Sequence, residues 1–131
     1  MGKRSTARRL AMQAIFQAEL SGTDISDALK NLFEEEDISA DGQEFATHLA
    51  SAVIENKGKI DSKIAELSKN WSISRIAALD KSILRLAVYE LMFEKDTPKA
   101  VVINEAIELA KRYSDEESAK FINGILGSVV V

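Results

Sequence analysis

The clearest structural signal in the chain lies in residues 73–94, which read ISRIAALDKSILRLAVYELMFE. Apolar side chains recur there every three or four residues, the spacing of one face of an α-helix. Further apolar positions beside them widen that face. A helix that is apolar around so much of its circumference is expected at the centre of a fold. The pattern therefore predicts a long central helix over about 73–94, capped at its start by Ser72 or Ser74.

The segments on both sides of this helix have the same helical period. Before the central helix they predict four helices: one over about 6–20, one from Thr23 or Asp24 to about 36, one from Ser39 or Asp41 to about 56, and a short one that ends at about Asn70. After the central helix they predict two more, one from Pro98 to Tyr113 and one from a cap between Ser114 and Ser118 through Val129. The connections are short, and no segment alternates as a strand would. The sequence therefore predicts an all-α protein of about seven helices.

Composition excludes several classes of site. The 131 residues suit a single domain, and the absence of Cys leaves no disulfide, thiolate zinc site or cysteine nucleophile. His48 is the only histidine and has no evident catalytic partner, so we expect a surface or half-buried side chain. No nucleotide-binding or metal-binding motif occurs. We therefore expect no enzyme, no metal and no cofactor, and, without a membrane span or signal peptide, a cytoplasmic protein.

Charge is unevenly distributed along the chain. Residues 1–9 contain Lys3, Arg4, Arg8 and Arg9 and carry +4, while the rest of the chain carries −8. Such a basic segment on an acidic protein predicts a contact to nucleic acid or phosphate, or else an ordinary solvated chain end. Arg8 and Arg9 are expected in the first helical turn, where cations oppose the helix dipole. Truncating both should then leave stability unchanged or slightly higher.

Three further features have two interpretations each. Asp80 has no partner within its own helix, so it is either a solvated surface acid or a contact to a basic partner. Arg85 and Glu90 interrupt the apolar face, and we expect charges of the following helix to pair with them. Phe121, next to Lys120, is either a core residue or a ring on which an unpaired RNA base stacks.

Three ordered segments resemble signatures of the bacterial NusB family of antitermination factors. They are residues 80–91, 102–111 and 118–126, and the bases leading into Ala14-Ile15-Phe16 are similar as well. The resemblance spans nearly the whole chain. It implies an all-α, NusB-like fold of one domain, with helical subdomains at about 1–70 and 71–131.

The resemblance also implies a function. Members of the family pair with NusE, the tenth protein of the small ribosomal subunit. The pair binds the boxA element of nascent ribosomal RNA transcripts and helps RNA polymerase to read through terminators. Some members self-associate, so a homodimer that masks the RNA face is a further expectation. By this resemblance the RNA-binding residues are Lys3, Arg4, Arg8, Arg9, Lys120 and Phe121, and the partner-binding residues are Phe16 and Asp80.

The chain departs from the family pattern in its N-terminal segment, and two other functions are compatible with its sequence. Ser5 and Thr6 stand where family members commonly carry bases, which implies weak RNA affinity without the partner. A NusB-like domain also precedes the catalytic domain of some ribosomal RNA cytosine methyltransferases, but this chain ends at Val131 with no cofactor-binding domain. The other rival is a helical module that binds only proteins and whose basic segment is incidental.

Overall fold

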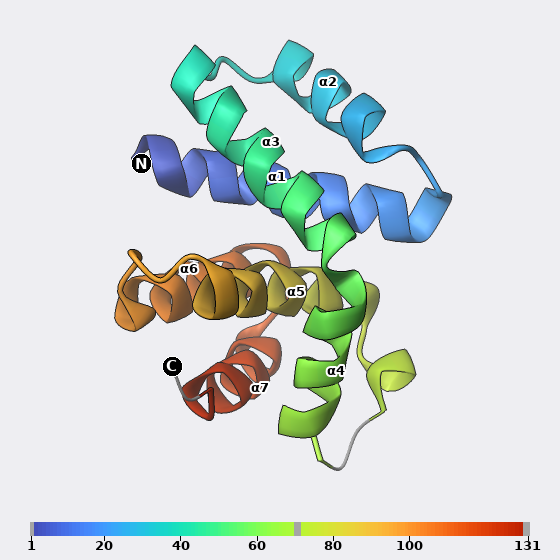
Figure 1. The fold of residues 1–131 in the computed structure, drawn as a ribbon, viewed down its shortest axis with the longest axis vertical. Coiled ribbons are helices and arrows are strands. Elements are labelled where there is room, and N and C mark those ends of the chain that lie inside the picture. The colour runs from blue at the N-terminus through green and yellow to red at the C-terminus, as the bar shows by residue number, and fades with distance from the viewer. Residues whose placement is uncertain (1, 70–71, 130–131) are drawn as a thin grey trace. The chain divides into compact units, whose positions relative to one another are not determined.

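The computed structural model describes residues 2–69 and 72–129 (Figure 1). In this part of the chain it contains seven α-helices, one 3-10 turn and no strand, which confirms the predicted all-α class. The elements are α1 (Lys3–Ser21), α2 (Ile25–Glu35), α3 (Ala40–Glu55), α4 (Lys57–Leu67), the 3-10 turn η1 (Ile73–Arg75), α5 (Ala78–Phe93), α6 (Lys99–Tyr113) and α7 (Glu116–Gly127). Asn70, the expected end of the fourth helix, lies outside the described residues. None of the described helices has the length and apolarity needed to cross a membrane.

The first helix begins earlier than the sequence predicted. Gly2 has an extended backbone and precedes the helix, and its carbonyl oxygen accepts a hydrogen bond of 3.1 Å from the Thr6 amide. Lys3 and Arg4 therefore lie in the first turn of α1, and the two later arginines lie one turn further on. The expected placement of Arg8 and Arg9 in the first turn was wrong, because glycine before the helix allows it to start at residue 3.

The central helix begins later than predicted. Residues 73–75 form η1 instead, and Ile76 and Ala77 have extended backbones that separate this turn from α5. Neither expected serine caps α5. Their hydroxyls bond to each other at 3.1 Å, and the residue before α5 is Ala77. As a result, Asp80 lies in the first turn of α5 rather than in the middle of a longer helix.

The described helices group into two compact units, Met1–Glu55 and Asn56–Val131. In the first unit α1 packs against both α2 and α3, and Figure 1 shows α3 crossing α1. Both helices bury small side chains completely, Ala11 and Ala14 on α1 and Ala46 and Ala50 on α3. Small residues allow the two helix backbones to approach closely, so this unit is built around the pair α1 and α3.

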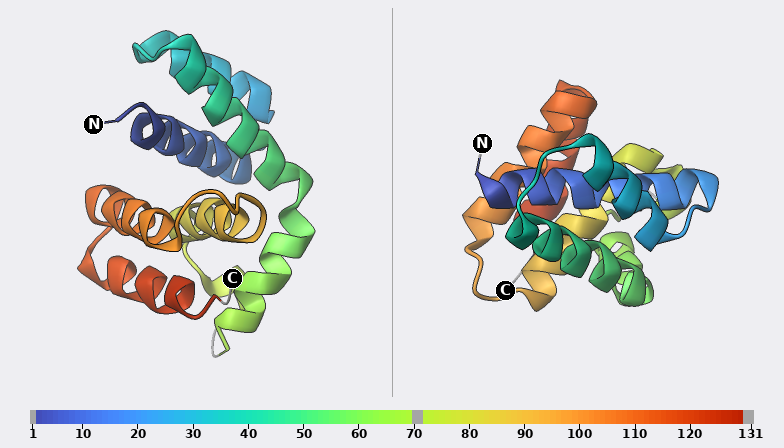
Figure 2. Two further views of the ribbon diagram at one scale, coloured as in Figure 1. Left: turned by 60° about the vertical axis from the view of Figure 1, so that its left-hand side comes forward. Right: turned by 90° about the horizontal axis from the view of Figure 1, so that it is seen from above.

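The second unit is organised around α5. This helix contacts α4, α6 and α7, and Figure 2 shows the helices of the unit from two further directions. The central position predicted for this helix is confirmed within its unit. The division between the units falls at Glu55 and Asn56 rather than near residue 70, because α4 packs on α5. That the two units make one domain stays a prediction.

A buried ion pair ties α4 to α5. The Arg85 side chain donates to both carboxylate oxygens of Asp61, from Nε to Oδ1 at 2.8 Å and from Nη2 to Oδ2 at 3.0 Å. Arg85 is 4% exposed, so its charge depends on such partners. Asp61 lies on the helix that precedes α5, whereas a partner on the following helix was expected. This two-point contact fixes how α4 lies along the central helix.

Replacing Asp61→Ala tests the importance of this pair. We expect the free energy of unfolding to fall by about 1.5–3 kcal/mol, the range for hydrogen bonds to charged groups. Urea unfolding followed by circular dichroism measures the change. Lys63→Ala is the matched control, because the Lys63–Glu66 pair on the same helix joins a one-third exposed and a two-thirds exposed side chain. That control should cost well under 1 kcal/mol, and an equal loss for both variants would contradict the assignment.

Candidate nucleic-acid interface

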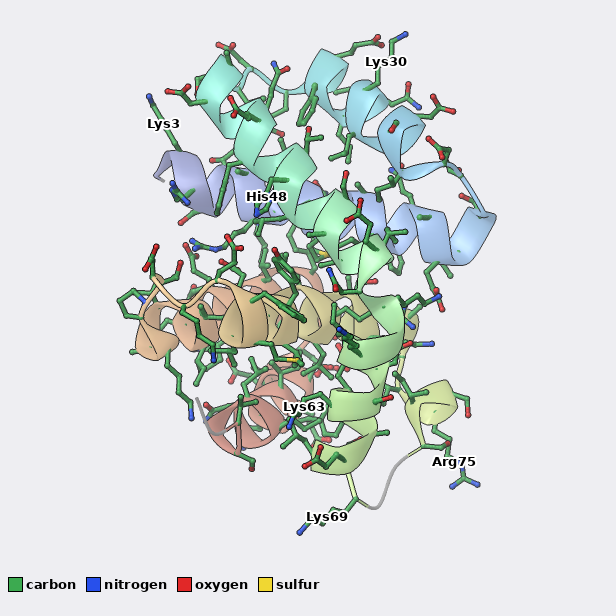
Figure 3. All side chains as sticks on the ribbon, viewed as in Figure 1. Lys3, Lys30, His48, Lys63, Lys69 and Arg75 are labelled. Atoms are coloured by element: carbon green, nitrogen blue, oxygen red, sulfur yellow. The ribbon has the colours of Figure 1, made fainter. Side chains whose placement is uncertain are left out.

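The N-terminal cations are part of α1 and differ in exposure. Lys3 and Arg4 are exposed, and Figure 3 shows Lys3 extending away from the first turn. Arg8 is 4% exposed. The guanidinium carbons of Arg4 and Arg8 lie 4.0 and 5.6 Å from the centre of the Phe45 ring on α3. Both distances are within the range of cation–π attraction, so an aromatic ring of the same unit holds two of the four predicted RNA-binding cations.

Arg9 is held by charge and hydrogen bonding. Its Nη2 forms an ion pair with Glu36, the residue after α2, and its Nη1 lies 3.5 Å from the Gln13 side-chain oxygen. Arg9 is 9% exposed, and the side chain of Glu36 is about one-third exposed. This acid therefore offsets the positive charge that Arg9 would offer to RNA. Arg9 also joins α1 to the end of α2, a structural role that the sequence analysis did not predict.

In the second unit, Asp80 is a buried acid in the first turn of α5. Its carboxylate is buried, with 8% of the residue exposed, so the expectation of a solvated surface acid was wrong. The first turn of α7 covers it: the Ser118 hydroxyl donates to Oδ2 at 2.9 Å. Asp115 caps α7 by accepting from the Ser118 amide at 2.7 Å, which confirms a cap in the predicted range. The other carboxylate oxygen of Asp80, Oδ1, is buried without a hydrogen-bond partner.

A hollow of about 290 Å³ opens beside Asp80. Its lining residues are Arg75, Ile76, Ala77, Asp80, Glu117, Ser118 and Phe121. We name it the acidic hollow after its two carboxylates. Carboxylates lining a hollow together with an aromatic residue suit a planar ligand that brings hydrogen-bond donors. The structure therefore brings Asp80, expected at the protein partner, together with Phe121, expected at RNA.

Several lining residues were not predicted. Arg75, Glu117 and Ser118 belong to this hollow, yet none was chosen from the sequence. The available signal was helical spacing, since Glu117 and Ser118 precede Phe121 by four and three positions and so share a face of α7. Arg75 had no such signal, because it reaches the hollow only through η1, which the sequence analysis read as helix.

The other predicted residues are distributed as follows. Lys120 is exposed beside the half-buried Phe121 on α7, and Phe16 is half-buried on α1. Phe16 and Asp80 thus belong to different units. His48 is exposed on α3, within the surface or half-buried placement expected for it, and is labelled in Figure 3. Among the described residues, no group of three or more His, Cys, Asp or Glu side chains could hold a metal ion.

The pKa of Asp80 is raised above its ordinary value. Burial disfavours the charged carboxylate and is the largest cause, while the hydrogen bond from Ser118 acts in the opposite direction. The negative charge of nearby Asp115 adds to the increase. Ionised Asp80 therefore costs folding free energy that a ligand with hydrogen-bond donors could recover.

Replacing Asp80→Asn should stabilise the protein near neutral pH. The folded state favours the protonated carboxyl, so the stability that Asp80 provides is complete at low pH and is lost as the pH rises through its raised pKa. The amide of the variant does not ionise. Urea midpoints measured between pH 4 and 8 should therefore separate in favour of the variant as the pH rises toward the raised pKa of Asp80, and the difference should then stay constant at higher pH. A constant difference across that range would contradict the raised pKa.

Arg9→Ala should destabilise the protein. The sequence predicted instead that truncating both Arg8 and Arg9 would leave stability unchanged or slightly higher. The substitution removes a largely buried side chain that is ion-paired to Glu36. We expect a loss of about 1–2 kcal/mol, typical of a hydrogen bond to a charged group with one partly exposed partner. Thermal unfolding of Arg9→Ala against Lys30→Ala, an exposed lysine on α2, measures it. Equal melting temperatures would show that the pair contributes nothing.

Comparison with known proteins gives consistent matches over nearly the whole chain. The model of the NusB family matches residues 5–130. A transcription antitermination protein NusB of Acetivibrio thermocellus is 44% identical over 130 residues, which cover 99% of this chain and 89% of that protein.

Solved structures agree with the sequence matches. A crystal structure of the antitermination factors NusB and NusE in complex with double-stranded RNA matches with a TM-score of 0.88 and 32% identity, covering 96% of this chain and 94% of the other. A chain from a crystal structure of a plectonemic RNA supercoil matches with a TM-score of 0.93 and 33% identity, covering 98% and 94%. The chain belongs to the NusB family of transcription antitermination proteins.

Proposed function

We propose that this chain binds the boxA element of nascent RNA together with the ribosomal protein NusE and so helps RNA polymerase to read through terminators. The observation that carries the proposal is the match, over 96% of the chain, to a NusB solved with NusE and double-stranded RNA. Family membership along nearly the full length supports it. The negative charge of the rest of the chain supports it as well, because it leaves a polyanion few places to bind.

The proposed RNA-binding set combines charge and stacking. Lys3 and Arg4 of α1 and Lys120 of α7 are exposed cations suited to phosphates. Phe121 lines the acidic hollow and offers a ring face to an unpaired base. Arg8 and Arg9 complete the set with a smaller contribution, because they are only 4% and 9% exposed and Glu36 already pairs with Arg9.

For the partner NusE, the proposed contacts are Phe16 and Asp80. Phe16 presents a half-buried ring on α1. Asp80 is accessible only through the acidic hollow, so a partner would reach it with a long basic side chain rather than across a flat surface. The carboxylate of Asp80 would give such a side chain a charged acceptor.

We propose a regulatory rather than a catalytic role, exercised in the cytoplasm where transcripts are made. A methyl-transfer assay with ribosomal RNA tests the rival enzymatic reading. Sedimentation at several protein concentrations, with and without RNA, tests the homodimer. A dimer that dissociates when RNA is added would agree with an RNA face that self-association covers.

The double replacement Lys3→Ala with Arg4→Ala should weaken RNA binding and reduce its salt dependence. Removing two phosphate contacts to a single strand should lower the slope of log affinity against log salt by about 1.4. Fluorescence anisotropy with boxA RNA, with NusE present, measures the slope between 50 and 300 mM salt. Lys30→Ala on α2 is the control, since it removes an exposed cation outside the proposed set. Equal affinity of the unmodified protein for boxA and scrambled RNA would overturn sequence-specific recognition.

A further inference from the structure

Phe121 borders a second hollow besides the acidic one. This second hollow has a volume of about 390 Å³, and its other lining residues are Leu67, Ser68, Lys69, Lys120, Gly124 and Ile125. It lies between the end of α4 and one face of α7. Among the described residues, Phe121 is the one that lines both of these hollows.

The two hollows differ in charge. The lining of the second contains two exposed cations, Lys69 and Lys120, and no acid, so we name it the basic hollow. Buried Ile125 and half-buried Leu67 add an apolar surface next to the ring. Cations beside an aromatic and aliphatic surface match a nucleotide, whose phosphate is anionic and whose base stacks. An anionic ligand that enters here meets no opposing charge from the lining.

Gly124 is an independent sign that something approaches this hollow closely. It lies inside α7, is exposed, and has an ordinary helical backbone, since Gly22 is the only described glycine with positive φ. A Cβ atom added at Gly124 would meet no atom within 4 Å. Glycine inside a helix is less stable than alanine, and here the protein's own packing does not require it. Close approach of a ligand to the helix surface would require it.

We propose that single-stranded RNA continues across Phe121 into the basic hollow, where Lys69 and Lys120 hold a phosphate and the nucleotide lies against Gly124. Lys69 and Gly124 thereby join the RNA-binding surface, which extends from α7 to the end of α4. The proposal rests on the RNA-binding function proposed above and adds a second nucleotide site to it.

The alternative role for Lys69 is structural. It follows Ser68, the residue that ends α4, and a cation there interacts favourably with the helix dipole. A lysine that serves only the helix would change stability when it is removed, with no effect on RNA affinity or its salt dependence. The same measurements therefore distinguish the two roles.

The first arm of the test compares Lys69→Ala with Lys59→Ala. Both lysines are exposed, and Lys59 lies in the first turn of α4, outside the basic hollow. Anisotropy titrations with boxA RNA and NusE should show that Lys69→Ala lowers the salt slope by about 0.7, which corresponds to about fivefold weaker binding at 0.1 M salt. Lys59→Ala should bind as the unmodified protein does. Unchanged slope and affinity in Lys69→Ala would overturn the proposal.

The second arm fills the basic hollow without changing charge. Gly124→Gln places a side chain in the hollow, and Gly127→Gln places the same side chain on α7 outside either hollow, at another position where an added Cβ meets nothing. We expect Gly124→Gln to fold at least as stably as the unmodified protein and to bind RNA severalfold more weakly. Gly127→Gln should bind normally. Normal binding by Gly124→Gln would contradict the site.

The outcomes also separate this proposal from the proposed function. If the unmodified protein with NusE binds no boxA RNA, the proposed function itself fails. If it binds RNA and both Lys69→Ala and Gly124→Gln match their controls, only the basic hollow is wrong. If these variants lose NusE rather than RNA, measured by titration of NusE alone, the hollow is a protein-binding site and the proposal is overturned.

Discussion

The burial of α5 is the constraint on which the second unit depends. Eleven of the 16 residues of this helix are buried, and α4, α6 and α7 pack against it. Burying so much apolar surface fixes the covering helices within narrow limits, since protein interiors are close-packed. The first turn of α7 then lies over the first turn of α5, and the end of α4 lies beside α7. Both hollows are consequences of that packing.

The positions of the cations in the first unit follow from a competition between binding and folding. Four clustered bases favour a polyanion, but they also repel one another and need partners when RNA is absent. The structure supplies Phe45 for Arg4 and Arg8 and Glu36 for Arg9. A cation that already contacts a ring or an acid loses less side-chain entropy when it binds RNA. The same internal contact lowers the binding free energy that the cation gains from a phosphate. In the proposed interface, affinity for RNA should therefore depend most on the exposed cations.

What the sequence predicted and what it missed differ in the range of the interactions involved. Helical period, capping residues and breaks are local, and they predicted about seven helices and a cap between Ser114 and Ser118, where Asp115 lies. The burial of Asp80 depends on Ser118, which is 38 residues away, and the ion pair of Arg85 depends on Asp61, 24 residues away. Local spacing contains no information on such pairs. Charge and neighbouring residue types indicated the candidate RNA contacts and the resemblance assigned them, whereas the hollows follow from tertiary packing alone.

The opposite charges of the two hollows give the proposed RNA site a direction. A phosphate that entered the acidic hollow would meet two carboxylates, Asp80 and Glu117, against the single cation Arg75, so that hollow favours groups with hydrogen-bond donors over phosphate. The basic hollow favours the phosphate because its lining offers Lys69 and Lys120 and no acid. Phe121 lines both hollows, so the charges favour the strand orientation that places a phosphate on the side of Lys69 and Lys120. Charge repulsion thus adds selectivity that a uniformly basic groove, attractive to phosphate along its whole length, would lack.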